Sequence, residues 1–252
     1  MHVFIYDSRE AAGKAAAEQA SHVIRAAIVH KGEAVIILAT GTSQFDTLSA
    51  LISFPGIDWG RVAMFHLDEY IGLEPDHPAS FRRYLTERFL SGAGNLKAVN
   101  FIHGEAEDPA SECRRIGALI SSHVVDIALV GIGENGHLAF NDPPADFETQ
   151  RPFIVVELDE VCRRQQLGEG WFAALEDVPR HAISMSIQQI MKSRNIIASV
   201  PESRKAPAVK KALEGPVTPD CPSSILQRHP RCMVFLDTAS ASLLKGRYHG
   251  GN

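Results

Sequence analysis

Short apolar runs alternate with alanine-rich or amphipathic segments along the chain. Runs rich in Val, Ile and Phe predict strands, and the periodic segments between them predict helices. This alternation is typical of βα units around a parallel sheet. We therefore expect an α/β fold with three layers, in which an open, doubly wound (Rossmann-like), mostly parallel sheet carries helices on both faces. The predicted strands are residues 2–6, 34–39, 62–67, 124–131, 153–158, 196–200 and 232–236.

Several predicted helices have recognisable ends. The hydroxyl of Ser8 can accept a hydrogen bond from an otherwise unpaired backbone N–H at the start of a helix that reaches about residue 30. Asp108, which a proline follows, predicts the start of a second helix. A third helix ends at Gly215, and its Pro207 falls in the first turn, where proline is tolerated. No repeat or long linker interrupts the pattern, so we expect a single domain over residues 1–252.

Composition narrows the class of protein. A chain of 252 residues with 45% hydrophobic and 22% charged residues has the composition of an ordinary soluble globular protein. Its net charge of -5 and the absence of a basic stripe argue against a nucleic acid or a membrane surface as partner. The four cysteines show no CxxC spacing, and the start of the chain shows no signal-peptide pattern. We expect reduced thiols and a cytoplasmic protein.

The segment from Gly131 to Pro143, GIGENGHLAFNDP, directly follows a predicted buried strand. Its polar groups include the carboxamide of Asn135, the imidazole of His137 and the carboxylate of Asp142. Because ligands of open α/β sheets bind at the carboxyl ends of the strands, this grouping predicts a site. The alternative is a tight strand-to-helix turn with incidental polar residues.

A second small-residue loop, Thr40-Gly41-Thr42-Ser43, follows another predicted strand and precedes a helix. Its hydroxyls and closely approaching backbone N–H groups suit an oxyanion such as phosphate. The loop matches neither a Walker loop nor GxGxxG, so it implies no nucleotide. The alternative is an N-capping turn.

Two further positions are candidates. Asp68 and Glu69 follow a predicted strand, and only one carboxylate of such an adjacent pair is expected to face a pocket. A partly desolvated carboxylate there would suit a general base, although Asp-Glu pairs are common on surfaces. Lys205 lies in the first turn of a predicted helix, where the positive end of the helix dipole disfavours its charge and a bound anion would offset that effect. The alternative is a solvated surface lysine.

Together, these stretches resemble the glucosamine-6-phosphate deaminase (isomerase) family, which is related to the 6-phosphogluconolactonases. The match rests on LATGTS, FHLDEYIGL with HPASF, GIGENGHLAFNDP, ESRKAPAVKKALEG and CPSSILQRHP, which occur in family order over residues 36–244. The resemblance implies conversion of glucosamine 6-phosphate and water to fructose 6-phosphate and ammonia, without a metal or organic cofactor.

The resemblance also implies roles for individual residues. His137 would open the sugar ring, assisted by Asn135 and Asp142, and Asp68 would move a proton from C2 to C1. The substrate would be bound by Thr40, Gly41, Thr42, Ser43, Gly136 and Lys205. Well-known members carry a phosphate-binding arginine in a helix that differs here, and Arg163 is the candidate for it. The resemblance suggests a monomer or a small homo-oligomer without strong allosteric activation.

Three alternatives stay open at this point: a deaminase for the galactosamine epimer, a 6-phosphogluconolactonase, and a non-catalytic sugar-phosphate sensor. The lactonase motif usually has Asp before its Gly-His pair and lacks the AFN-acid-Pro ending. Sensors with this fold follow a helix-turn-helix, whereas this sequence opens on a predicted strand.

Overall fold

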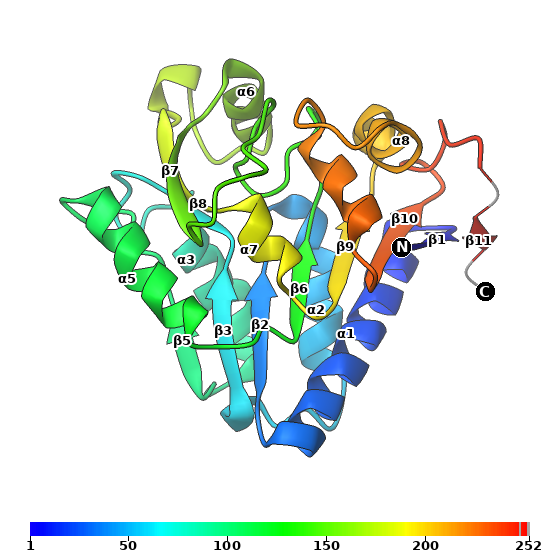
Figure 1. Cartoon of the computed structure of the whole chain (residues 1–252), viewed down its shortest axis with the longest axis horizontal. Helices are drawn as coiled ribbons and strands as arrows, with labels where there is room; N and C mark the ends of the chain where they lie inside the picture. The colour runs from blue at the N-terminus through cyan, green and yellow to red at the C-terminus, as the bar shows by residue number, and fades with distance from the viewer. Residues whose placement is uncertain (247, 251–252) are drawn as a thin grey trace.

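The computed structural model describes residues 1–246 and 248–250. In that part of the chain, an eight-stranded sheet has the order β11-β1-β10-β9-β6-β2-β3-β5, and all its neighbouring strands run parallel (Figure 1). The α/β fold predicted from the sequence is confirmed. In spatial order the strands are β11 (His249–Gly250), β1 (His2–Tyr6), β10 (Cys232–Asp237), β9 (Ile196–Val200), β6 (Ile127–Val130), β2 (Ala34–Leu38), β3 (Val62–His66) and β5 (Ala98–Asn100).

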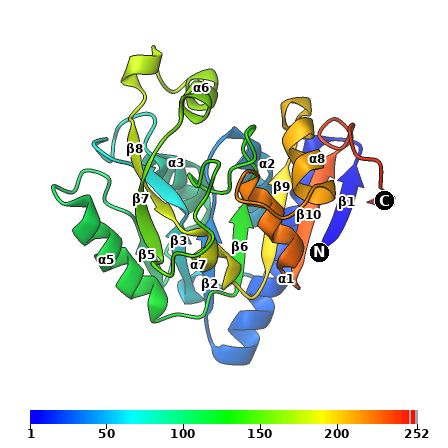
Figure 2. The ribbon, with the colours of Figure 1, turned by 45° about the horizontal axis from the view of Figure 1, so that its top comes forward.

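Helices cover both faces of this sheet because alternate residues of each buried strand point to opposite sides. In β2, Val35 and Ile37 join the apolar cluster under α5, α7 and α8, whereas Ile36 and Leu38 join the cluster under α1 and α2. Figures 1 and 2 show α7 and α2 on opposite sides of the strands. The main helices are α1 (Arg9–Lys31), α2 (Phe45–Ser53), α3 (Phe81–Leu85), α5 (Pro109–Ser121), α6 (Glu160–Gly168), α7 (Ile187–Met191) and α8 (Ala206–Glu214).

The predicted helix starts are confirmed. The hydroxyl of Ser8 accepts a hydrogen bond from Ala11 N at the start of α1. The carboxylate of Asp108 accepts one from Ala110 N at the start of α5. Pro207 lies in the first turn of α8, after a short 3₁₀ helix, η5 (Ser203–Lys205).

A second, antiparallel sheet of order β4-β8-β7 stands beside the carboxyl ends of the main sheet (Figure 2). The run predicted at residues 153–158 belongs to this sheet, and its partners β4 and β8 were not predicted. Asp68 is paired with Ser184 there, so the chain after β3 continues as a strand rather than a loop. These strands are β4 (Asp68–Tyr70), β7 (Phe153–Glu157) and β8 (His181–Met185).

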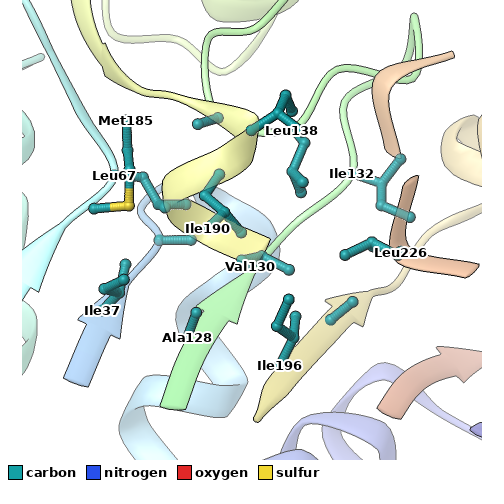
Figure 3. Close-up of a cluster of buried hydrophobic side chains, with 14 of the residues drawn as sticks. Ile37, Leu67, Ala128, Val130, Ile132, Leu138, Met185, Ile190, Ile196 and Leu226 are labelled. Carbon is teal, nitrogen blue, oxygen red and sulfur yellow. The ribbon is translucent and has the colours of Figure 1, made fainter. Parts of the chain in front are cut away.

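One apolar cluster joins the two sheets below the predicted site. Figure 3 shows Leu67, Val130 and Leu138 in this cluster with Met185 from β8. All four side chains are almost fully buried, so the segments that follow β3 and β6 rest on a packed base. A single domain stays our prediction. Within the residues described, no helix is both long and apolar enough to cross a bilayer.

Candidate active site

The predicted site residues converge at the carboxyl ends of four neighbouring strands, β9, β6, β2 and β3. The loop 40–43 follows β2, Asp68 follows β3, the segment 131–142 follows β6, and Lys205 follows β9. The order of the strands reverses between β2 and β6, which is where open α/β sheets form a crevice for ligands. A pocket that is partly open to solvent lies there, lined by residues of all four segments.

His137 is held by two neighbours from its own loop. Its Nδ1 lies 3.0 Å from Oδ1 of Asp142, and its backbone N–H donates to Oδ1 of Asn135 at 3.0 Å. The Asn135 amide in turn donates to Asp142 at 2.9 Å. Because Asp142 binds Nδ1, the other ring nitrogen, Nε2, is left for the pocket that His137 lines.

Burial alone would raise the pKa of the Asp142 carboxyl, but the bond and charge of His137, with hydrogen bonds from Asn135 and from Asp159 N, bring that pKa below its usual value. Asp142 therefore stays ionised near neutral pH. An ionised carboxylate orients the imidazole and stabilises its protonated form.

Glycines set the path of the loop before His137. A Cβ atom added to Gly133 would lie 2.3 Å from the His137 ring, so a side chain there would displace the imidazole. Gly136 has a φ of +91°, in the left-handed region that favours glycine. Asn141 then fixes the end of the loop, because its amide donates to the carbonyls of Leu138 and Met185.

Asp68 and Glu69 face opposite ways, as expected for adjacent residues of a strand. Glu69 accepts hydrogen bonds from Ser80 Oγ, Phe81 N and Arg82 N, so it is a structural residue at the start of α3. Asp68 lines the pocket, and its carboxylate has no hydrogen-bond partner among residues 1–246 and 248–250. Burial, with the nearby charge of Glu69, raises the pKa of Asp68 to about 8. Such a carboxyl group is suited to accept and return a proton.

The loop 40–43, predicted to bind an anion, lines the pocket through Thr40, Gly41 and Ser43. Gly41 has a φ of +100°, and its carbonyl accepts a hydrogen bond from the Tyr84 hydroxyl at 3.0 Å. Lys205 is 3% exposed, yet its ammonium group has no hydrogen-bond or ion-pair partner within the described residues. Burial and the neighbouring Arg204 lower the pKa of Lys205 to about 8. A buried, unpaired cation facing a loop of small residues is suited to bind an anion.

Arg204 is a further cation at this loop, and the sequence analysis missed it. Its guanidinium group lies 3.4 Å from Thr42 Oγ1 and forms ion pairs with Glu134 at 2.7 Å and Glu202 at 2.6 Å. Arg9 pairs with the same Glu202 and donates to the Thr42 carbonyl. These contacts hold Arg204 beside the predicted phosphate loop.

The structure corrects the expectation for Arg163. Its guanidinium group donates to the carbonyls of Leu175 and Val178, which ties α6 to the segment before β8. Arg163 is therefore not a pocket residue. Four other predicted residues do not line the pocket but lie on the same loops as residues that do: Thr42, Asn135, Gly136 and Asp142. Those that line the pocket are Thr40, Gly41, Ser43, Asp68, His137 and Lys205.

Three other side chains of the α6 segment line the pocket and were not predicted: Gln165, Gln166 and Glu169. In Figure 1, α6 lies above the carboxyl ends of β2, β3 and β6. Glutamine and glutamate at the end of a polar helix are common on surfaces. The only signal in the sequence was that this helix differs from the one in well-known family members.

Potential metal ligands lie together in one place in the part of the chain described. The ligand atoms of His137, Asp142 and Cys162 are all within 4.8 Å of one another. Burial and the surrounding carboxylates raise the pKa of the Cys162 thiol, so a metal would have to displace a tightly held proton. A reaction without a metal remains our prediction.

Comparisons with known proteins agree with this geometry. The family model described as glucosamine-6-phosphate isomerases/6-phosphogluconolactonase matches residues 7–234. A glucosamine-6-phosphate deaminase from Geobacillus sp. is 38% identical over 90% of this chain and 91% of its own length. The solved structure of a monomeric glucosamine-6-phosphate deaminase has a TM-score of 0.89 at 33% identity, covering 97% of this chain and 100% of that one.

A 6-phosphogluconolactonase from Shewanella baltica has a TM-score of 0.77 at 20% identity, covering 94% of this chain and 98% of that one. At this identity the likeness shows the fold alone. The resemblance stated from the sequence motifs is confirmed by the family model and the deaminase relatives. The chain belongs to the family of glucosamine-6-phosphate isomerases and 6-phosphogluconolactonases.

Proposed function

We propose that this protein is a glucosamine-6-phosphate deaminase, which converts glucosamine 6-phosphate and water to fructose 6-phosphate and ammonia. The observation that carries the proposal is the pairing, in one pocket, of a His137–Asp142 unit with the buried carboxyl group of Asp68. Deaminase relatives of similar length support the choice of substrate.

The 6-phosphate binds the loop 40–43 together with Lys205 and Arg204. Lys205 supplies a charge that is buried and otherwise unpaired, and Arg204 supplies a planar group already fixed by Glu134 and Glu202. Because the phosphate is remote from the reacting carbons, its binding energy positions the sugar rather than activating it.

Ring opening is carried out by His137. The imidazole takes the proton of the anomeric hydroxyl and delivers it to the ring oxygen as the bond between C1 and the ring oxygen breaks, which gives the open-chain aldehyde and restores the neutral imidazole. Asp142 stabilises the imidazolium form during this exchange, and Asn135 fixes the loop through its bonds to both residues. Gly136 allows the backbone to turn beside the substrate.

Asp68 then removes the proton from C2, and the resulting enolamine is protonated at C1 by the same carboxyl group. The product of this transfer is an imine at C2. Water adds to that carbon, and the nitrogen leaves as ammonia, which completes the conversion to fructose 6-phosphate. A carboxyl group with a raised pKa can both accept and return the proton.

The protein acts without a nucleic acid or a membrane as partner, as a monomer or a small homo-oligomer in the cytoplasm. A solved relative described as monomeric supports the simpler state. The four cysteines are free, which supports a reducing compartment.

The test is ammonia release from glucosamine 6-phosphate and galactosamine 6-phosphate, run beside hydrolysis of 6-phosphogluconolactone. We expect ammonia and fructose 6-phosphate from the gluco substrate. Ammonia from galactosamine 6-phosphate alone would make the galacto epimer the substrate and leave the proposed deamination reaction unchanged. Lactone hydrolysis without ammonia from either sugar would replace the proposal by a lactonase.

A further inference from the structure

Helix α6 carries two consecutive glutamines that bind the two catalytic segments separately. Gln165 Oε1 accepts a hydrogen bond from Glu134 N at 3.0 Å, in the loop that leads to His137. Gln166 Oε1 accepts one from the Tyr70 hydroxyl at 2.8 Å, in the strand that begins with Asp68. The helix therefore connects the segment of the proposed ring-opening group to the segment of the proposed base.

The orientation of the Gln165 carboxamide is fixed by chemistry. A backbone N–H can only donate, so the atom facing Glu134 N must be the carbonyl oxygen. The NH₂ group of Gln165 then has no partner among residues 1–246 and 248–250, although the side chain lines the pocket. A partnerless amide donor beside a cavity is ready to bind an oxygen atom of a ligand.

The position of Gln165 along the pocket follows from its neighbours in the helix. Gln166 binds Tyr70, in the strand of Asp68, and Gln165 binds the backbone of Glu134, whose side chain pairs with Arg204 beside the loop 40–43. Glu169, which directly follows the last residue of α6, lies against the anion loop, since its Oε2 is 3.6 Å from the position that a Cβ atom on Gly41 would take. Four helical residues span about 6 Å, roughly the distance between the reacting carbons and the phosphate of a hexose 6-phosphate. The last turn of α6 therefore borders the pocket from the strand of Asp68 to the loop 40–43.

We propose that Gln165 is a specificity-determining residue whose Nε2 donates a hydrogen bond to the hydroxyl oxygen on C3 or C4 of the substrate. This inference rests on the proposed function. A donor held rigidly by its own carbonyl oxygen discriminates against a ligand that lacks the matching hydroxyl, since the amide would then stay unpaired.

The experiment measures binding of 2-amino-2-deoxyglucitol 6-phosphate, an open-chain analogue that cannot react, and of its 3-deoxy and 4-deoxy forms. Gln165→Met removes the amide and keeps the length of the side chain. Arg164→Met is the control, because Arg164 is exposed on the same helix and pairs only with Glu160 within the described structure. Calorimetry gives the dissociation constants, and thermal melting reports whether each variant is folded.

We expect Gln165→Met to weaken binding of the full analogue roughly tenfold relative to the wild type. One deoxy form should bind the variant and the wild type equally well, because that ligand lacks the hydroxyl that the Gln165 amide would bind. Inhibition by inorganic phosphate should not change, and Arg164→Met should behave like the wild type. Equal weakening for all three analogues would overturn the inference and leave the proposed function intact. Wild-type protein that does not bind the analogue at all would overturn both.

Turnover separates the remaining cases. Wild-type protein that binds the analogue but releases no ammonia from glucosamine 6-phosphate would refute the deaminase reaction. The loss of the Gln165 effect with one deoxy form would still support its contact with that hydroxyl.

Discussion

Nδ1 of His137 and Oδ1 of Asp142 lie 3.0 Å apart, with both side chains nearly buried. Asp142 also accepts hydrogen bonds from Asn135 and from Asp159 N, so its position does not depend on the histidine alone. The imidazole is thus held by a carboxylate that is itself fixed.

Asp142→Asn removes the charge that stabilises the protonated imidazole and should keep the side-chain shape. We expect kcat for ammonia release to fall roughly 10²- to 10⁴-fold, while binding of the open-chain analogue changes little. Asp76→Asn, at an exposed position, is the matched control. A variant of Asp142 with wild-type kcat would show that His137 does not need this partner.

Gly133→Ala should inactivate the protein without unfolding it. The new methyl group would lie 2.3 Å from the His137 ring and push it out of place. A shift of about 1 Å in a catalytic group can cost roughly 10²-fold in rate, which steady-state kinetics would detect. Gly168→Ala is the control, since nothing lies within 4 Å of its added Cβ. Equal activity in the two variants would contradict the placement of His137.

Binding of inorganic phosphate should weaken as the pH rises above about 8. The pKa of Lys205 is lowered to about 8, so its positive charge is present below that pH and is lost above it. Lys205→Arg keeps the charge at high pH, because arginine does not titrate in this range. The inhibition constant of phosphate from pH 7.5 to 10 should rise by at most about tenfold per unit in the wild type and stay nearly flat in the variant. Parallel curves would place the phosphate away from Lys205.

Arg204 and Arg163 should behave differently when each is replaced by glutamine. Arg204→Gln should raise the phosphate inhibition constant roughly tenfold, because a cation beside Thr42 is lost. Arg163→Gln should leave that constant unchanged and lower the melting temperature, since two backbone carbonyls lose their donor. The opposite assignment of effects would restore Arg163 as the phosphate ligand.

The parts of the fold that the sequence could predict are those with local causes. The apolar runs predicted the inner strands of the main sheet. Ser8 and Asp108 predicted helix starts, because each side chain accepts a hydrogen bond from a backbone N–H two or three residues later. The two-residue strand β11 and the short β5 carry no such pattern. The strand β4 could not be foreseen, because its pairing depends on β8, which lies more than 100 residues away.

The site divides in the same way. Residues on the loops that follow β2 and β6 stand together in the sequence, so their common role could be inferred. Which arginine reaches the phosphate loop depends on non-local contacts: Arg163 meets the carbonyls of a distant segment, and Arg204 is drawn to Thr42 and Glu134. Gln165 carries no local signal, since its role depends on the backbone of Glu134.

The most direct test of the proposed mechanism compares wild-type protein with Asp68→Asn on glucosamine 6-phosphate, with ammonia and fructose 6-phosphate both quantified. Asparagine keeps the size of the side chain and cannot accept the C2 proton. We predict stoichiometric ammonia and fructose 6-phosphate from the wild type, and a loss of at least roughly 10²-fold in kcat for the variant with little change in analogue binding. Undiminished turnover by Asp68→Asn would contradict the assignment of the base, and no ammonia from the wild type would contradict the reaction itself.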